Sequence, residues 1–378
     1  MIDRMSTRAA LVTVVLVVAA ACGGSGATTN PTTGPTAAPS GAAPSAAPTA
    51  ATGSIQMNGA GATFPFPLYS KWFYQYAFVD PSVQFNYQSI GSGGGIQQIT
   101  AKTVDFGASD AILNSDQFAA APGIQMFPSV AGADVVAYNV SEFAKLTTPL
   151  TLDGPTTANI FQGKITNWND PAIATLNPGV TLPDKPITVV HRSDGSGTTF
   201  IFTDYLSNVS PDWKTAVGNA TSVEWPVGLG GKGNDGVTGT LLQTDGSIGY
   251  VELAYAISNK LAFANMNNAA GKTVTASLDS TKAAMGDFAT DMPDTLARSI
   301  VNAPGDASWP IAGYTYLLLY MNQTDCAKAQ KLVDFVKWAQ SSGTDYATGL
   351  NYVPLPDNVK QQVLAKVAQI TCNGAPLG

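Results

Sequence analysis

Three short segments of the sequence place glycines and hydroxyl side chains just before an apolar stretch with helical spacing. They cover residues 59–67, 91–95 and 191–198. The start of a helix presents N–H groups that the helix cannot use and the positive end of its dipole. Glycine lets a ligand approach the backbone, and serine or threonine adds rotatable donors. Together these features predict a site for an oxyanion.

One such segment alone is weak evidence, because Gly-Ser turns before helices are usually only turns and caps. The presence of three strengthens the prediction. The third segment also carries Arg192, whose planar guanidinium can donate two parallel hydrogen bonds to an oxyanion. We therefore expect the three segments to meet in one cleft.

The elements around these segments are predicted from hydrophobic spacing. Residues 83–87 alternate apolar and polar side chains, and 104–110 and 187–190 are strand-like, the former ending in a carboxylate. Helical spacing follows each glycine-rich segment, at Leu68, Trp72 and Tyr76, at Ile96 and Ile99, and at Phe200, Ile201 and Tyr205. Strands that alternate with helices predict an α/β fold.

The N-terminus predicts export. Arg4 and Arg8 precede an apolar run at 9–21 that is too short to span a bilayer, so residues 1–21 resemble a signal peptide. The small residues before Cys22 resemble a lipobox and predict its lipidation. Ordinary signal cleavage, with an incidental Cys22, is the alternative. Residues 22–54 form an uncharged Pro/Ala/Thr-rich segment, which predicts a tether at the outer face of the cell membrane.

Charge and cysteine content narrow the possible functions. Removal of residues 1–21 takes away Asp3, Arg4 and Arg8, which leaves 17 basic and 25 acidic residues and a net charge of −8. This balance argues against nucleic-acid binding. Cys326 and Cys372 remain, and an even pair in an exported protein predicts a disulfide, although two unpaired buried thiols are an alternative. Their spacing does not match a metal site, and no cofactor is expected.

Longer motifs resemble those of the periplasmic phosphate-binding proteins of phosphate ABC transporters, over nearly the whole chain after the tether. The matching segments are GAGATFP at 59–65, GSGGG at 91–95, VDFGASD at 104–110, RSDGSGT at 192–198, WPVGLGGKGNDG at 225–236 and IGYVE at 248–252. The chain departs from the family pattern at His191 and Gly93, neither of which is a matched contact position. These departures bear on the fine tuning of ligand binding and not on the predicted class of ligand.

The resemblance implies a set of ligand contacts. Matched residue by residue, the predicted phosphate-binding residues are Thr63, Phe64, Ser92, Asp110, Arg192, Ser196, Gly197 and Thr198. A buried carboxylate tolerates an anion only if the ligand brings a proton, so Asp110 predicts phosphate over fully ionised sulfate. Asp194 is expected to orient Arg192 from behind, although it can also be a simple turn residue.

The resemblance also implies the architecture and partners. The family has a two-lobed periplasmic binding protein fold of type II, with the ligand in the cleft between lobes. This fold implies one lobe from 55–134 plus 309–378 and a second from 135–308, with hinge-side strands at 134–138 and 311–320. The expected partners are inorganic phosphate, the permease subunits of the transporter and, through Cys22, a membrane. A monomer is expected.

A hydrolase and a structural or adhesive lipoprotein are the alternatives to a binding protein. Ser196 and His191 are the only elements of a hydrolase site, but the pattern is not the G-x-S-x-G elbow and lacks a third group, so we predict no enzyme activity. A purely structural or adhesive surface lipoprotein is the second alternative. The G-x-G-x-x-G match at 228–233 follows no clear strand and is expected to be a glycine-rich loop.

Overall fold

A large mixed β-sheet carries the segments that the sequence analysis identified. The computed structural model describes residues 53–377, which lie within one compact unit, so the predicted signal peptide, lipidated cysteine and most of the tether lie outside the described residues. The strands of the main sheet are β1 (Ile55–Gly61), β2 (Val83–Ser89), β3 (Phe106–Ser109), β4 (Ile124–Asn139), β6 (Thr188–Arg192), β7 (Leu229–Gly231), β8 (Ser247–Glu252), β9 (Ala262–Phe263), β12 (Ala312–Tyr320) and β14 (Val353–Pro354).

Thirteen α-helices accompany the strands within the described residues. They are α1 (Phe66–Val79), α2 (Ser92–Thr100), α3 (Ser115–Ala120), α4 (Gly154–Phe161), α5 (Pro171–Leu176), α6 (Gly197–Val209), α7 (Pro211–Ala216), α8 (Gly233–Gln243), α9 (Leu253–Ser258), α10 (Leu278–Gly286), α11 (Cys326–Ala339), α12 (Thr344–Gly349) and α13 (Asp357–Val367). The predicted α/β class is therefore confirmed.

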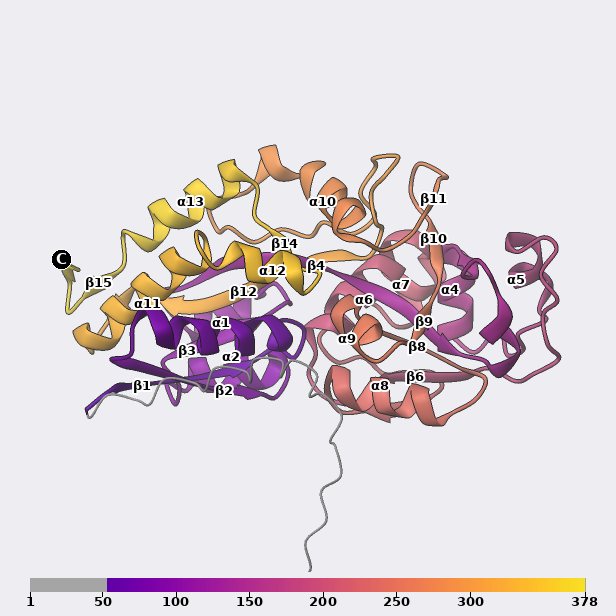
Figure 1. Ribbon diagram of the computed structural model, residues 1–378, viewed down its shortest axis with the longest axis horizontal. Helices are drawn as coiled ribbons and strands as arrows, with labels where there is room; N and C mark the ends of the chain where they lie inside the picture. Colours follow the sequence, from indigo (N-terminus) through magenta and orange to yellow (C-terminus); the bar gives the residue numbers. More distant parts are fainter. Residues whose placement is uncertain (1–52, 378) are drawn as a thin grey trace, which may run out of the picture. The chain divides into compact units, whose positions relative to one another are not determined.

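The strand order explains how distant segments come together. The main path runs β2-β1-β3-β12-β4-β8-β6-β7. The pairs β1/β2, β1/β3, β6/β7 and β6/β8 are parallel, so the loops after β1, β3 and β6 leave from the carboxyl ends of parallel strands. In such sheets ligands bind beyond these ends. Figure 1 shows α1 and α2 beside β1 to β3, and α6, α8 and α9 beside β6 and β8.

The 16-residue strand β4 runs through both halves of the sheet. It pairs with β12 up to Ala133 and with β8 from Asp134 onward, and both pairings are antiparallel. The change of partner lies beside the predicted lobe boundary at 134/135. Because the sheet continues across this point, the division into lobes stays a prediction.

Two small sheets complete the strand set. One joins β11 (Thr273–Val274), β10 (Asn265–Asn267) and β5 (Thr151–Leu152), and the other joins β13 (Asn322–Gln323), β15 (Thr371–Cys372) and β16 (Ala375–Pro376). The latter holds the C-terminal tail, where Cys326 and Cys372 form the predicted disulfide, with their Cα atoms 5.4 Å apart. The bridge ties the start of α11 to β15.

The helices predicted after the glycine-rich segments are present, and their apolar faces are buried. Leu68, Trp72 and Tyr76 of α1 are buried, as are Ile96 and Ile99 of α2. The expectation of a loop at 228–233 is wrong in part, because residues 229–231 form β7 beside β6 and α8 begins at Gly233. Two of the three residues of β7 are glycines, so the strand lacks the alternation of apolar and polar side chains by which strands are predicted. No helix among residues 53–377 is long and apolar enough to cross a membrane.

Candidate anion-binding site

The three glycine-rich loops meet in the structure. The Gly93 N–H, in the first turn of α2, donates to the Gly195 carbonyl oxygen at 2.9 Å. A Cβ atom built on Gly197 would lie 2.3 Å from Asp110 Oδ2 and 2.5 Å from Ser92 Oγ. Only glycine fits there, because any side chain would push Asp110 and Ser92 away from the start of α6. The second and third segments and Asp110 thus share one buried region.

Two threonine hydroxyls in this region have their acceptor capacity filled. Thr63 Oγ1 accepts hydrogen bonds from the backbone N (3.2 Å) and Nδ2 (2.9 Å) of Asn234. Thr198 Oγ1 accepts from Asn234 Nδ2 (3.0 Å) and Arg192 Nη1 (3.2 Å). A hydroxyl has two lone pairs and one proton. Each of these groups is therefore set to donate its proton to a further acceptor.

Arg192 is held in a fixed orientation. Its Nε donates to Asp194 Oδ1 at 2.8 Å and its Nη2 to Asp194 Oδ2 at 2.6 Å, a two-point pair. The Gly233 N–H also donates to Asp194 Oδ1 at 2.9 Å. Burial alone would raise the pKa of Asp194, but the Arg192 guanidinium holds it below its usual value. The hydrogen bonds to Asp194 and Thr198 use three of the five guanidinium N–H groups, which leaves two for a ligand.

Asp110 is the carboxyl group of the site. It is buried, and its N–H donates to Ser92 Oγ at 3.1 Å. Its Oδ1 has no hydrogen-bond partner among the described residues. Burial raises the pKa of Asp110 to about 7, while neighbouring hydroxyl groups and Arg192 oppose the rise. Near neutral pH this side chain can therefore accept a proton from a ligand or share one with it.

The remaining predicted contacts lie at helix starts. Ser196 is the N-cap of α6, and its Oγ accepts from the Thr199 N–H at 3.0 Å. Gly197 and Thr198 follow in the first turn, where N–H groups have no partner within the helix. Phe64 precedes α1 and is fully buried. All eight predicted contact residues are thus placed around one region.

The structure also identifies residues that the sequence analysis missed. Asn234 bridges Thr63 and Thr198, while the Tyr255 and Tyr352 hydroxyls donate to the carbonyl oxygens of Thr63 and Phe64, both at 2.6 Å. Asn234 lies within the matched motif at 225–236, so the sequence could have indicated it as a site residue. No sequence feature indicates the two tyrosines, because their contacts join residues 192 and 288 positions apart.

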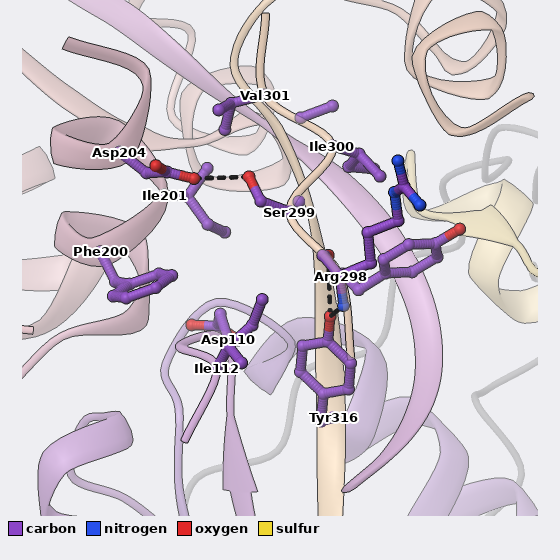
Figure 2. A pocket seen from close by; sticks show the side chains of 13 residues that line it. Asp110, Ile112, Phe200, Ile201, Asp204, Arg298, Ser299, Ile300, Val301 and Tyr316 are labelled. Carbon is purple, nitrogen blue, oxygen red and sulfur yellow. Dashed lines mark hydrogen bonds between the residues drawn. The ribbon is translucent and has the colours of Figure 1, made fainter. Parts of the chain in front are cut away.

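A pocket is lined by Asp110 and by the segment at 298–301, which we call the strap (Figure 2). This strap is bonded to β12, because the Arg298 N–H donates to Tyr316 Oη and the Tyr316 hydroxyl donates to the Arg298 carbonyl oxygen. It is also bonded to α6, because Ser299 Oγ donates to Asp204 Oδ2. The strap therefore links two elements that flank the site.

The residues considered for a hydrolase serve other purposes. His191 stacks on Trp225, with ring centroids 4.9 Å apart, and its Nδ1 lies 3.0 Å from the Arg192 carbonyl oxygen. Ser196 caps α6. Within residues 53–377, no group of three or more His, Cys, Asp or Glu side chains could hold a metal ion. The site combines hydrogen-bond donors with the Asp110 carboxyl group, while the Asp194 carboxylate is paired with Arg192.

Comparisons with known proteins agree with this geometry. Residues 44–342 match the PBP superfamily domain. The chain is 47% identical to the phosphate-binding protein PstS of Xylella fastidiosa strain 9a5c, over 83% of this chain and 85% of the relative. It is 46% identical to the PstS protein of Pasteurella multocida, over 82% and 89% of the two chains.

A solved structure shares the fold. The human phosphate binding apolipoprotein superposes with a TM-score of 0.67 at 21% identity, over 85% of this chain and 99% of that chain. The two chains therefore share a mixed α/β binding-protein fold. The PstS relatives are substrate-binding proteins and not enzymes. With nearly half of its residues identical to those relatives over most of their length, the chain belongs to the PstS family of phosphate-binding proteins.

Proposed function

We propose that this protein captures inorganic phosphate outside the cytoplasm and delivers it to the permease of an ABC transporter. The names of the relatives support the ligand, and the family role supports the transporter. The predicted phosphate-binding residues are carried forward as the proposed contacts: Thr63, Phe64, Ser92, Asp110, Arg192, Ser196, Gly197 and Thr198.

One observation carries the proposal. The Thr63 and Thr198 hydroxyls each accept two hydrogen bonds, so each has only a proton left to offer. Two N–H groups of Arg192 and the first-turn N–H groups of α6 add to these donors. A cluster of fixed donors with few acceptors suits a tetrahedral oxyanion.

The single carboxyl group selects among oxyanions. Phosphate near neutral pH carries at least one proton, which it can share with Asp110 Oδ1. Sulfate carries none, and it would leave two unpaired negative groups in a buried site. The pKa of Asp110, raised by burial to about 7, makes such sharing easy at neutral pH. The site therefore favours phosphate.

Export, membrane anchoring and closure of the lobes complete the proposed role. We infer that residues 1–21 are a signal peptide, that Cys22 carries a lipid anchor, and that residues 22–54 tether a monomeric domain to the outer face of the membrane. The two lobes proposed above would close around phosphate by a hinge at β4 and β12, as open α/β binding proteins do.

Calorimetric titration with phosphate tests the site. Thr198→Val removes one donor to the anion, and a hydrogen bond to a charged group contributes roughly 1.5–3 kcal/mol, so affinity is expected to fall about tenfold to a hundredfold. Thr215→Val is the control, because Thr215 is exposed on α7 and, among the described residues, bonds only the Pro211 carbonyl oxygen. Equal affinity in both variants, or no binding by the unaltered protein, contradicts the proposal.

A further inference from the structure

Two buried carboxyl groups lie directly opposite each other on β4 and β8. The strand register pairs Asp134 with Glu252, and both residues are fully buried. Side chains of opposed residues share one face of the sheet, with Cβ atoms about 5 Å apart. Asp134 Oδ1, Asp134 Oδ2 and Glu252 Oε1 are buried without a hydrogen-bond partner among the described residues. Two ionised groups in this setting would be very costly.

The two contacts of the Tyr352 hydroxyl indicate how many protons the groups around it must carry. Its Oη lies 2.6 Å from the Phe64 carbonyl oxygen and 2.8 Å from Glu252 Oε2. A phenol has one proton and a carbonyl oxygen has none. Both contacts can be hydrogen bonds only if Glu252 also carries a proton. When Tyr352 donates to Phe64, a protonated Glu252 donates to Tyr352, and its Oε2 can still accept from the Ala254 N–H at 2.9 Å.

The surrounding charges favour the same state. The titratable groups that interact with this pair are Asp110, Arg192, Tyr250, Tyr255 and Tyr352, and Tyr255 also interacts with Asp235. Burial, reinforced by the charge of Asp110, raises the pKa of both Asp134 and Glu252 well above their usual values. If both groups were ionised, they would add two negative charges to those of Asp194 and Asp110 around a single guanidinium, and an anion would be repelled.

We propose that Asp134 and Glu252 are neutral carboxylic acids in the folded protein, and that the Glu252 proton, donated to Tyr352, positions the Thr63–Phe64 loop. A proton on Asp134 turns one of its two unpartnered oxygens into a donor on the face of the sheet that Glu252 shares. Glu252 is thus a positioning residue: it acts on the anion through Tyr352 and the Phe64 peptide group. This second part rests on the proposed function, while the protonation state does not.

Carbon-13 NMR of the unaltered protein tests the protonation directly. The chain contains only three glutamates, Glu142, Glu224 and Glu252, and the first two are exposed. With carboxyl-labelled glutamate we expect two signals of ionised groups at pH 7 and one of a protonated group. Glu142→Gln and Glu224→Gln assign the exposed signals by their loss. Three ionised signals at pH 7 would overturn the proposal, whether or not phosphate binds.

The pH dependence of unfolding gives an independent readout for both acids. An acid that is neutral when folded and ionised when unfolded lowers the ratio of folded to unfolded protein tenfold for each pH unit above its unfolded pKa of about 4. Asp134→Asn and Glu252→Gln should each remove one such tenfold factor. Asp306→Asn, at an exposed carboxyl, is the control. Slopes equal to that of the unaltered protein would contradict the assignment.

Phosphate affinity tests the positioning role. Glutamine can donate to Tyr352 and leucine cannot, so Glu252→Leu is expected to weaken phosphate binding at least tenfold more than Glu252→Gln. Tyr352→Phe should resemble Glu252→Leu, because it removes the same link to Phe64. Equal affinities for the Gln and Leu variants would overturn the positioning role. A failure of the unaltered protein to bind phosphate would instead refute the proposed function and leave the NMR result standing.

Discussion

At the scale of single residues, we propose that Asp110 determines which anion the site accepts. Arg192, the two threonine hydroxyls and the α6 N-terminus would serve any small oxyanion equally well. Asp110 alone is an acceptor, and its Oδ1 has no hydrogen-bond partner among the described residues. A buried acceptor of this kind penalises a ligand that has no proton to give. On this proposal, the selectivity of the site for phosphate over sulfate depends mainly on the side chain of Asp110.

Replacement of this carboxyl group should reduce selectivity. Asp110→Asn introduces an amide that can donate to sulfate and still accept from phosphate, so the ratio of the two affinities should fall at least tenfold. Calorimetric titrations with each anion measure the ratio. Asp116→Asn, at an exposed carboxyl in α3, is the matched control. A preference that survives Asp110→Asn would contradict the role of Asp110.

Sulfate binding should depend on pH through the same group. Because the pKa of Asp110 is about 7 in the folded protein, the carboxyl group is mostly protonated below pH 7 and can then donate to sulfate. Above that pKa, the protonated fraction falls tenfold per pH unit, and sulfate affinity should fall with it. Phosphate brings its own proton and should weaken less. Competition titrations at several pH values measure both, and a pH-independent sulfate affinity would be inconsistent with this mechanism.

At the scale of elements, the strap at 298–301 connects β12 to α6 beside Asp110 (Figure 2). Ser299 supplies the bond to α6. Its partner Asp204 has a pKa raised by burial, and the hydrogen bond from Ser299 opposes the rise. The strap therefore connects two elements that line a pocket beside the site.

Loss of this bond should speed release of the ligand. Ser299→Ala removes one hydrogen bond between an exposed serine and a half-buried carboxyl group, worth about 0.5–1.5 kcal/mol when both elements are fixed. We expect the phosphate dissociation rate, measured by stopped flow, to rise about twofold to tenfold, with a smaller change in the association rate. Ser341→Ala, at an exposed serine after α11, should leave dissociation unchanged. Equal rates in both variants would show that the strap does not control release.

The disulfide is a second link between elements. It closes a loop of 46 residues between the start of α11 and β15. In the chain-entropy model, a loop of this length stabilises the folded state by about 4 kcal/mol. The double variant Cys326→Ser and Cys372→Ser should lose about that amount in denaturant unfolding, while phosphate affinity in the native protein is kept. A loss below about 1 kcal/mol would indicate that the small sheet holds the tail without the bridge.

Some elements could be predicted from the sequence and others could not. The helices α1 and α2 are predicted by apolar residues at helical spacing after glycine or proline, and the same residues form their buried faces. The strand β7 has two glycines in three residues and gives no such signal. Its place beside β6 is set by the tertiary structure, and sequence periodicity does not report it.

At the scale of the whole molecule, the site depends on contacts between distant parts of the chain. The motif resemblance located the eight proposed contact residues. It did not indicate that Asn234 of α8 joins Thr63 to Thr198, or that Tyr352, near the C-terminus, holds the Phe64 carbonyl oxygen. Such contacts arise only when β4 carries the chain from one half of the sheet to the other.

Closure should accompany binding throughout the molecule. The loops before α2 and α6 touch directly at Gly93 and Gly195, so the described conformation has both sides of the site in contact. Phosphate would stabilise this state by linking donors on both sides. It should therefore also stabilise the folded protein, by an amount that grows with the logarithm of ligand concentration.

The most direct test is a calorimetric titration of the unaltered protein with phosphate in the presence of excess sulfate at pH 8. At that pH Asp110, whose pKa is about 7, is mainly ionised, and sulfate has no proton to share. We expect phosphate to bind at one site per chain, with an affinity that sulfate barely changes. Competitive loss of the phosphate signal, or no signal without sulfate, would contradict a proton-selective phosphate site.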